Sequence, residues 1–141
     1  MQALSGGVIT TSDPVPALPQ DRKDLLRLIR PSQPVMAEMP FITDDREELV
    51  IIHRLPDWNL LYILNPTGHL LRIHYDLADM FGMETVFQYR FDWNDDDRIV
   101  SENSSCFSDT LAPHESALLF ITEDPMTAKP SNLWGRDKSY C

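Results

Sequence analysis

The spacing of hydrophobic positions changes near residue 40. Before that point, apolar residues recur three and four positions apart within residues 21–30, which is the spacing of one helix face. Asp21 is a suitable N-cap, and Pro31 ends the helix because proline has no N–H to donate and clashes with the preceding turn. The pattern predicts a helix of about ten residues. Its apolar stripe consists of Leu25, Leu26, Leu28 and Ile29.

From residue 48 onward, the pattern is that of short β-strands. Strands are predicted at residues 49–55, 58–64, 71–75, 86–93, 99–100, 107–111 and 117–121. Pro56 and Asp57 supply the turn of a hairpin between the first two, and residues 77–81 fit one helical turn. Strands spaced about 8–15 residues apart favour a sandwich. We therefore predict a mainly β protein, an antiparallel β-sandwich with a short N-terminal strand and helix appended.

Two of the predicted strands are apolar on both faces. Residues 49–52 and 60–64 contain almost no polar side chains, whereas residues 71–75 alternate cleanly. A strand buried on both faces lies between two layers. One layer is the second sheet, and a neighbouring domain is expected to supply the other.

The chain divides into three parts. Residues 1–40 hold a short strand within residues 3–10 and the predicted helix, which together are too small to bury each other well. Residues 41–124 form the predicted β-sandwich, and residues 125–141 form an irregular tail with Leu133 and Trp134 as its apolar anchor. The first part is therefore expected to be a piece of a larger unit.

Charge excludes two classes of partner. The net charge is −10, and residues 41–124 hold seventeen acidic but only five basic side chains. Such a surface repels phosphate groups, so neither nucleic acid nor anionic membrane is an expected partner. No apolar run approaches the roughly 20 residues that cross a bilayer, and the N-terminus lacks the pattern of a signal peptide.

The two cysteines, Cys106 and Cys141, are too few for a disulfide scaffold. They also lack the spacing of metal ligands. Unpaired thiols are typical of a reducing compartment, so a cytoplasmic location is expected. No cofactor is predicted.

An acidic cluster and two histidines are candidate metal ligands. The cluster consists of Asp92, Asp95, Asp96 and Asp97 with Asn94. Oxygen ligands this close could hold Ca²⁺, but the spacing of a calcium loop is missing and a solvated turn is favoured. His53 and His74 lie on predicted strands and could face each other, but without a third ligand two exposed histidines are favoured. No metal site is therefore predicted.

Aromatic residues are the candidates for sugar binding. Phe87, Tyr89, Phe91 and Trp93 alternate with polar residues on one strand, and Trp58 lies near a strand end. Such a face suits either sandwich-core packing, which is favoured, or a platform on which sugars stack. If sugar binds, Trp58 and Trp93 are the residues expected to contact it. No Gly-x-Ser-x-Gly sequence supports a serine hydrolase.

Several sequence segments resemble segments of α-galactosidase (melibiase)-like glycoside hydrolases. Residues 3–13 and 25–29 are similar to the last strand, loop and helix of the family's catalytic barrel. Residues 58–65, 75–79 and 111–119 are similar to phrases of its C-terminal antiparallel β-domain, in the same order. The resemblance covers most of the chain up to residue 122.

The resemblance implies a domain without its own catalytic residues. In the family, two carboxylates on earlier barrel strands act as nucleophile and acid/base, and both would lie before Met1. Asp13 matches a position near the rim of the family's pocket and is a candidate substrate contact. The expected function is a non-catalytic domain that packs on a catalytic barrel in the same or a companion polypeptide. A carbohydrate-binding module that uses exposed aromatics is the alternative.

Overall fold

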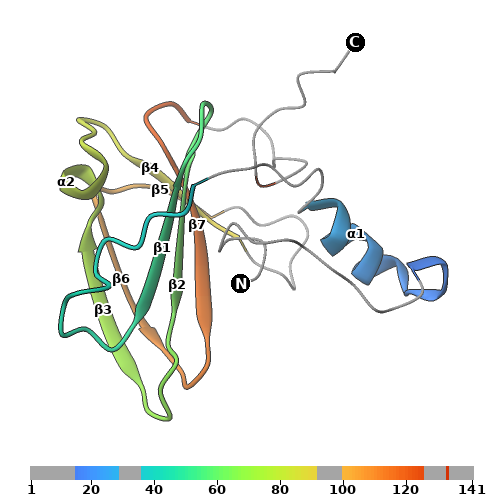
Figure 1. Cartoon of the computed structure of the whole chain (residues 1–141). Coiled ribbons are helices and arrows are strands. Elements are labelled where there is room, and N and C mark those ends of the chain that lie inside the picture. The colour runs from blue at the N-terminus through green and yellow to red at the C-terminus, as the bar shows by residue number, and fades with distance from the viewer. Residues whose placement is uncertain (1–14, 29–35, 92–99, 126–132, 134–141) are drawn as a thin grey trace.

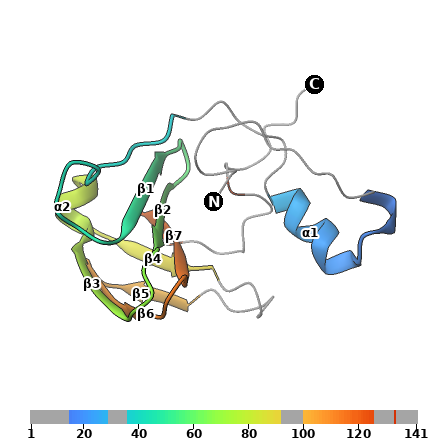
Figure 2. The same ribbon diagram turned by 60° about the horizontal axis from the view of Figure 1, so that its bottom comes forward.

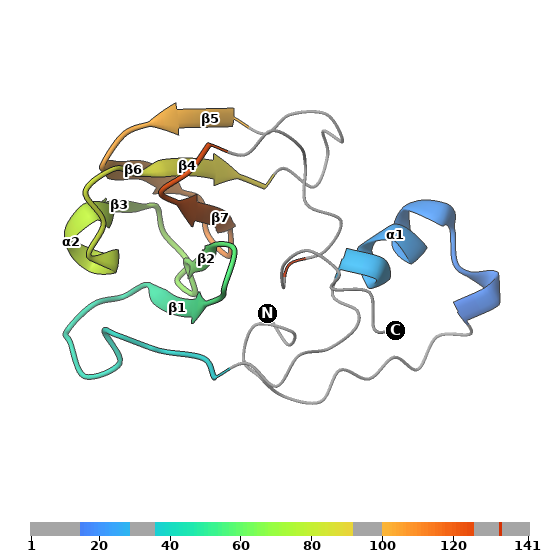
Figure 3. The same cartoon turned by 90° about the horizontal axis from the view of Figure 1, so that it is seen from above.

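A computed structural model describes residues 15–28, 36–91, 100–125 and Leu133 (Figure 1). A short 3-10 turn, η1 (Val15–Ala17), precedes helix α1 (Gln20–Leu28), which confirms the predicted helix. Helix α1 stands beside the strands and not against them (Figure 3). None of the described helices is long and apolar enough to cross a membrane. The strand predicted within residues 3–10 lies outside the described residues.

The strands form two antiparallel sheets that face each other (Figure 2), so the predicted β-sandwich is confirmed. The five-stranded sheet has the order β1 (Leu49–Arg54), β2 (Asn59–Leu64), β7 (Ser116–Thr122), β4 (Phe87–Arg90) and β5 (Val100–Asn103). The two-stranded sheet pairs β3 (Leu71–Asp76) with β6 (Cys106–Leu111). Strand β4 ends at Arg90, three residues before the predicted end at Trp93, which lies outside the described residues.

Strands β1 and β2 form the predicted hairpin. Their register pairs Leu49 with Leu64 at one end and Arg54 with Asn59 at the other. The N–H of Leu55 donates to the carbonyl of Trp58 at 3.1 Å and closes the turn. The apolar run 58–64 therefore becomes the strand next to the centre of the five-stranded sheet, where β7 pairs with its other edge.

Asn65 connects the two sheets where β2 ends. Its side chain is fully buried, and its Nδ2 lies 2.7 Å from the carbonyl of His69, 3.1 Å from that of Leu111 and 3.0 Å from that of Ala112. Its Oδ1 accepts the N–H of Thr67 at 2.9 Å. Because β2 and β6 belong to different sheets, these bonds hold the sheets together at this end.

Helix α2 (Leu77–Phe81) is the predicted helical turn, and it closes the opposite end of the two-stranded sheet. Asp76 is its N-cap and accepts the N–H of Asp79 at 3.1 Å. Gly82 ends the helix at φ 64°, a left-handed conformation that glycine adopts without strain. The two buried residues of α2, Leu77 and Phe81, complete the core between the sheets.

The inner core lies between the two sheets and draws residues from both. Its buried members are Val50, Ile52, Leu61, Ile63, Ile73, Tyr75, Leu77, Phe81, Val86, Phe107, Leu111, Ala117, Leu119 and Ile121. On β3 the inward residues are apolar and the outward ones exposed, as the alternation predicted. Burial of this apolar area is the main favourable term in folding.

The segment before β1 covers one side of the inner core. Phe41 stacks on Tyr75 with ring centroids 6.0 Å apart, and the Arg46 guanidinium lies 4.1 Å from the Phe41 centroid. The Tyr75 hydroxyl donates to Glu48 Oε1 at 2.7 Å, and Arg46 Nη1 lies 3.4 Å from the same oxygen. Glu48 thus receives hydrogen bonds from a buried phenol and from a cation.

These contacts shift the pKa values of both acids. Burial alone raises the pKa of the Glu48 carboxyl, but hydrogen bonds from Tyr75, its own backbone and Arg46 outweigh it, so the pKa is held below its ordinary value. Burial, together with the neighbouring Glu48 carboxylate, raises the pKa of the Tyr75 phenol well above its usual range. Glu48 is therefore charged and Tyr75 neutral near pH 7.

Candidate docking face on the five-stranded sheet

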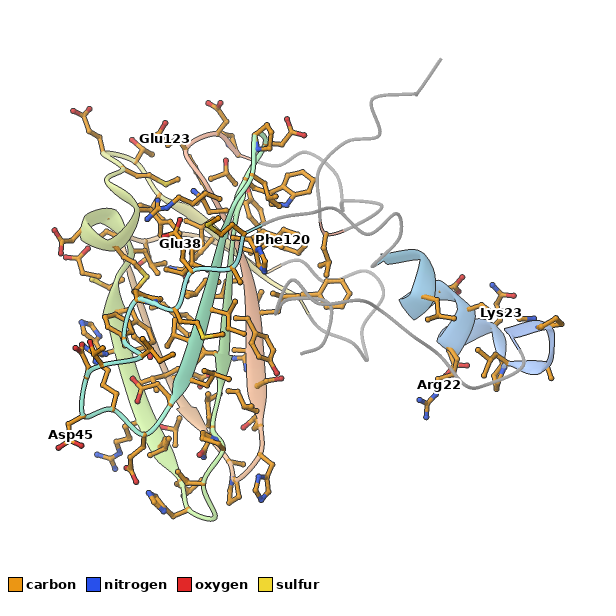
Figure 4. The ribbon with its side chains drawn as sticks, viewed as in Figure 1. Arg22, Lys23, Glu38, Asp45, Phe120 and Glu123 are labelled. Atoms are coloured by element: carbon orange, nitrogen blue, oxygen red, sulfur yellow. The ribbon has the colours of Figure 1, made fainter. Side chains whose placement is uncertain are left out.

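Strands β1, β2 and β7 are buried on both faces, although the second sheet covers only one. Alternate residues point to the inner core, and the residues between them form a second apolar cluster on the opposite side of the five-stranded sheet, here called the outer face. Its buried members are Ile51, Trp58, Leu60, Tyr62, Tyr89, Leu118, Phe120 and Leu133. Figure 4 shows Phe120 on the side of the strands that is turned toward α1.

The aromatic strand faces this outer cluster. The sequence correctly places Phe87, Tyr89 and Phe91 on one face in apolar packing, but they pack on the outer cluster and not between the sheets. Phe91 contacts Phe120 edge to face at 6.4 Å. Gln88, which the alternation predicts in water, is only 4% exposed. The prediction failed because both faces of this sheet are covered, so a polar position need not face solvent.

Trp58 is part of the same cluster. It is 8% exposed, lies edge to face with Phe120 at 5.6 Å, and donates its indole N–H to the carbonyl of Leu133 at 2.9 Å. Leu133, the predicted anchor of the tail, is 2% exposed. A tail residue thus contacts the outer face through a buried hydrogen bond. The predicted role of Trp58 in sugar binding stays a prediction.

The N-terminal part of the chain reaches the sandwich from the outer side. Ala37 and Met39 pack against the outer cluster. Between them, Glu38 forms an antiparallel bridge with Ile52 through bonds of 2.9 and 2.8 Å, and its carboxylate pairs with Arg54 at 3.1 Å. In Figures 1 and 3, α1 also lies on this side of the five-stranded sheet.

Of the two histidines that were predicted to be exposed, one is exposed and the other is buried. His74 is exposed, and its Nδ1 lies 2.6 Å from Ser108 Oγ, but His53 is only 1% exposed. The prediction of an exposed His53 is wrong because β1 is buried on both faces. The two residues lie on different sheets. Among the described residues, no group of three His, Cys, Asp or Glu side chains could hold a metal ion.

Other predicted site residues lie outside the described part of the chain. These are Asp13, Trp93, Asp92, Asp95, Asp96 and Asp97. The absence of polar positions in residues 49–52 and 60–64 predicted a covered second face on these two strands. It did not predict that Trp58, Tyr89 and Leu133 belong to the same surface.

Comparison with known proteins identifies the fold. No family model and no curated protein matches the chain. Among solved structures, a Bacillus halodurans C-125 protein assigned as an α-N-acetylgalactosaminidase matches with a TM-score of 0.66 and 16% identity over 87% of this chain. α-Galactosidase I from Mortierella vinacea matches with a TM-score of 0.61 and 10% identity over 90%. A GH27 β-L-arabinopyranosidase from Geobacillus stearothermophilus matches with a TM-score of 0.66 and 14% identity over 92%.

The matched part of these structures is their C-terminal β-domain. This chain has the fold of that domain. It spans 30%, 34% and 29% of the three matched chains, so most of each of those proteins has no counterpart here. The predicted resemblance to the C-terminal region of α-galactosidase-like glycosidases is thereby confirmed at the level of the fold.

Proposed function

We propose that this chain is a non-catalytic accessory domain of an α-galactosidase-like, retaining glycoside hydrolase, and that its outer face packs on the catalytic barrel and stabilises it. The observation that carries the proposal is the second apolar cluster, on the side of the five-stranded sheet that the two-stranded sheet does not cover. Its buried members are at most 8% exposed because Leu133, Ala37 and Met39 of this chain pack on them, so we propose that the barrel meets this side of the sheet together with the segments that cover it.

The path of the chain also supports the outer face as the side on which a barrel would pack. Residues 1–40 resemble the last strand and helix of a barrel, and they enter the sandwich along the outer cluster through Ala37 and Met39. A barrel built from those residues would therefore stand on the outer side. Helix α1, which belongs to this part, lies there in Figure 1.

The proposal assigns the chemistry to residues outside this chain. In matched enzymes the β-domain is one part of a chain about three times as long. A barrel active site needs loops from several strands, and this chain would supply at most one of them. Purified protein is expected to leave a nitrophenyl α-galactoside unhydrolysed, and measurable turnover that resists further purification would overturn the proposal.

The size of the native polypeptide tests the proposal in the cell. An antibody raised against this chain should detect a band much heavier than 16.2 kDa, or a 16.2 kDa chain that co-purifies with a separate barrel. A lone 16.2 kDa chain without a barrel partner would contradict it. The free thiol of Cys106 supports the further proposal of a cytoplasmic location, and fractionation tests that.

The alternative function is a carbohydrate-binding module. Such a module needs an open aromatic ring, whereas Trp58 and Tyr89 are 8% and 3% exposed. These two rings therefore do not provide an open platform for sugar stacking. Saturable quenching of tryptophan fluorescence by galactose or a raffinose-type sugar would favour this alternative.

A further inference from the structure

A cavity of about 270 Å³ lies on the inner side of the five-stranded sheet, away from the outer face. It is lined by residues of three strands, among them Gln88 and Arg90 of β4, Phe107 and Asp109 of β6, and Leu119 of β7. These residues come from both sheets. The cavity is therefore an opening of the sandwich itself, where polar side chains replace the apolar ones of the inner core.

The polar groups of the cavity offer both donors and acceptors. Arg90 Nη1 donates to Asp109 Oδ2, with 38% and 26% of the two side chains exposed. The second oxygen of Asp109 accepts the N–H of Thr110 at 2.8 Å, which fixes the carboxylate. The Arg90 guanidinium carries five N–H donors, and its contact with Asp109 engages one of its terminal nitrogens.

Gln88 adds a fixed acceptor to this pair. Its Nε2 donates to the carbonyls of Ser104 at 3.0 Å and Cys106 at 2.9 Å. Because both amide hydrogens are engaged, only Oε1 can bond a ligand, and that bond must come from a donor. Gln88 is 4% exposed, and its side chain cannot turn away without breaking two partly buried hydrogen bonds.

We propose that this cavity binds one small, neutral, polyhydroxylated molecule such as a monosaccharide. Adjacent hydroxyl groups can accept from Arg90 and donate to Asp109 and Gln88 without separating the ion pair. Phe107 and Leu119 belong to the inner core and are 9% and 1% exposed, so they bound the cavity and the polar groups carry the recognition. A charged ligand would compete with one member of the pair. The volume lies just below the roughly 300–1,000 Å³ of ligand pockets, which suits one ring and not a chain of sugars.

This site is independent of docking, because it lies on the inner side of the sheet and stays accessible when the outer face is covered. Titration of the ¹⁵N-labelled chain with D-galactose, D-glucose and myo-inositol tests it by NMR. At least one should cause saturable shifts at the amides of Gln88, Arg90, Phe107 and Asp109. Galacturonate and glucosamine should bind more weakly than the neutral sugar.

Conservative variants provide the second readout. Arg90→Gln and Asp109→Asn should each weaken binding about tenfold or more, because each removes a charge-assisted hydrogen bond. Arg72→Gln changes an exposed arginine on β3 and should leave binding unchanged. The proposal is overturned if none of the three neutral probes gives saturable shifts, if the shifts map to Trp58 and the outer face, or if the charged sugars bind more tightly.

Discussion

At the scale of single residues, polar side chains hold the sandwich together where apolar packing ends. Asn65 joins the end of β2 to the end of β6, and Glu48 accepts the hydroxyl of Tyr75 beside the inner core. Both are buried or partly buried groups with defined partners. Loss of one partner then costs more than one exposed hydrogen bond, because the other partner is left unsatisfied.

Asn65→Ala tests the connection between the sheets. The substitution leaves three carbonyls without their donor, so the free energy of unfolding should fall by about 2–3 kcal/mol. Asn65→Asp should be at least as harmful, because a carboxylate cannot donate to carbonyls and would be buried as a charge. Urea unfolding measures both. Asn59→Ala, at a half-buried position on the same strand, is the control, and an equal effect there would refute the assignment.

The low pKa of Glu48 predicts a loss of stability in acid. A carboxyl whose pKa is depressed in the folded state stabilises the fold above its unfolded pKa, about 4.3. That contribution is lost as the pH falls through the folded pKa. In the wild type, the urea concentration at the unfolding midpoint should therefore fall once the pH is lowered below about 4.3. The same lowering of the pH should reduce the midpoint of Glu48→Gln by less. Glu84→Gln, at an exposed position, should follow the wild type. Equal pH dependence in all three proteins would contradict the assignment.

At the scale of elements, the sequence pattern predicted every described strand and both helices to within a few residues. Alternation along residues 71–75 also predicted which side of β3 is buried. It misassigned Gln88 and His53, because a period of two separates the faces of a strand but does not identify what covers each face. Gln88 is covered on the inner side, where it donates to the carbonyls of Ser104 and Cys106, whereas Leu133, Ala37 and Met39 cover the outer side of the sheet. These covering residues are distant in sequence or have no period of their own.

Gly82 and Gly68 form a matched pair for testing the end of α2. Gly82 has φ 64°, whereas Gly68 is not in a left-handed conformation, and neither position has an atom that would clash with an added Cβ. Gly82→Ala should lower stability by about 1 kcal/mol through backbone strain alone. Gly68→Ala should be neutral or slightly stabilising. Thermal unfolding compares them, and equal melting temperatures would show that the left-handed cap is unimportant.

At the scale of the whole molecule, the protein has two sheets and three regions that differ in polarity. The inner core is filled by both sheets, the outward side of β3 is polar, and the outer face is apolar with Trp58 and Tyr62 as its most exposed buried members, at 8% each. The known enzymes with this fold carry it as about a third of a longer chain. Packing of the outer face on a barrel is the claim on which the proposed function depends.

Photo-crosslinking in the source cell tests that claim most directly. A benzoylphenylalanine is introduced in the place of Tyr62 on the outer face, and separately in the place of Arg72 on the outward side of β3. Illumination should join residue 62, and not residue 72, to peptides of a catalytic barrel, as read by mass spectrometry. Cross-links from residue 62 that reach only residues 126–141 of this chain, or barrel peptides joined to residue 72 alone, would contradict the account.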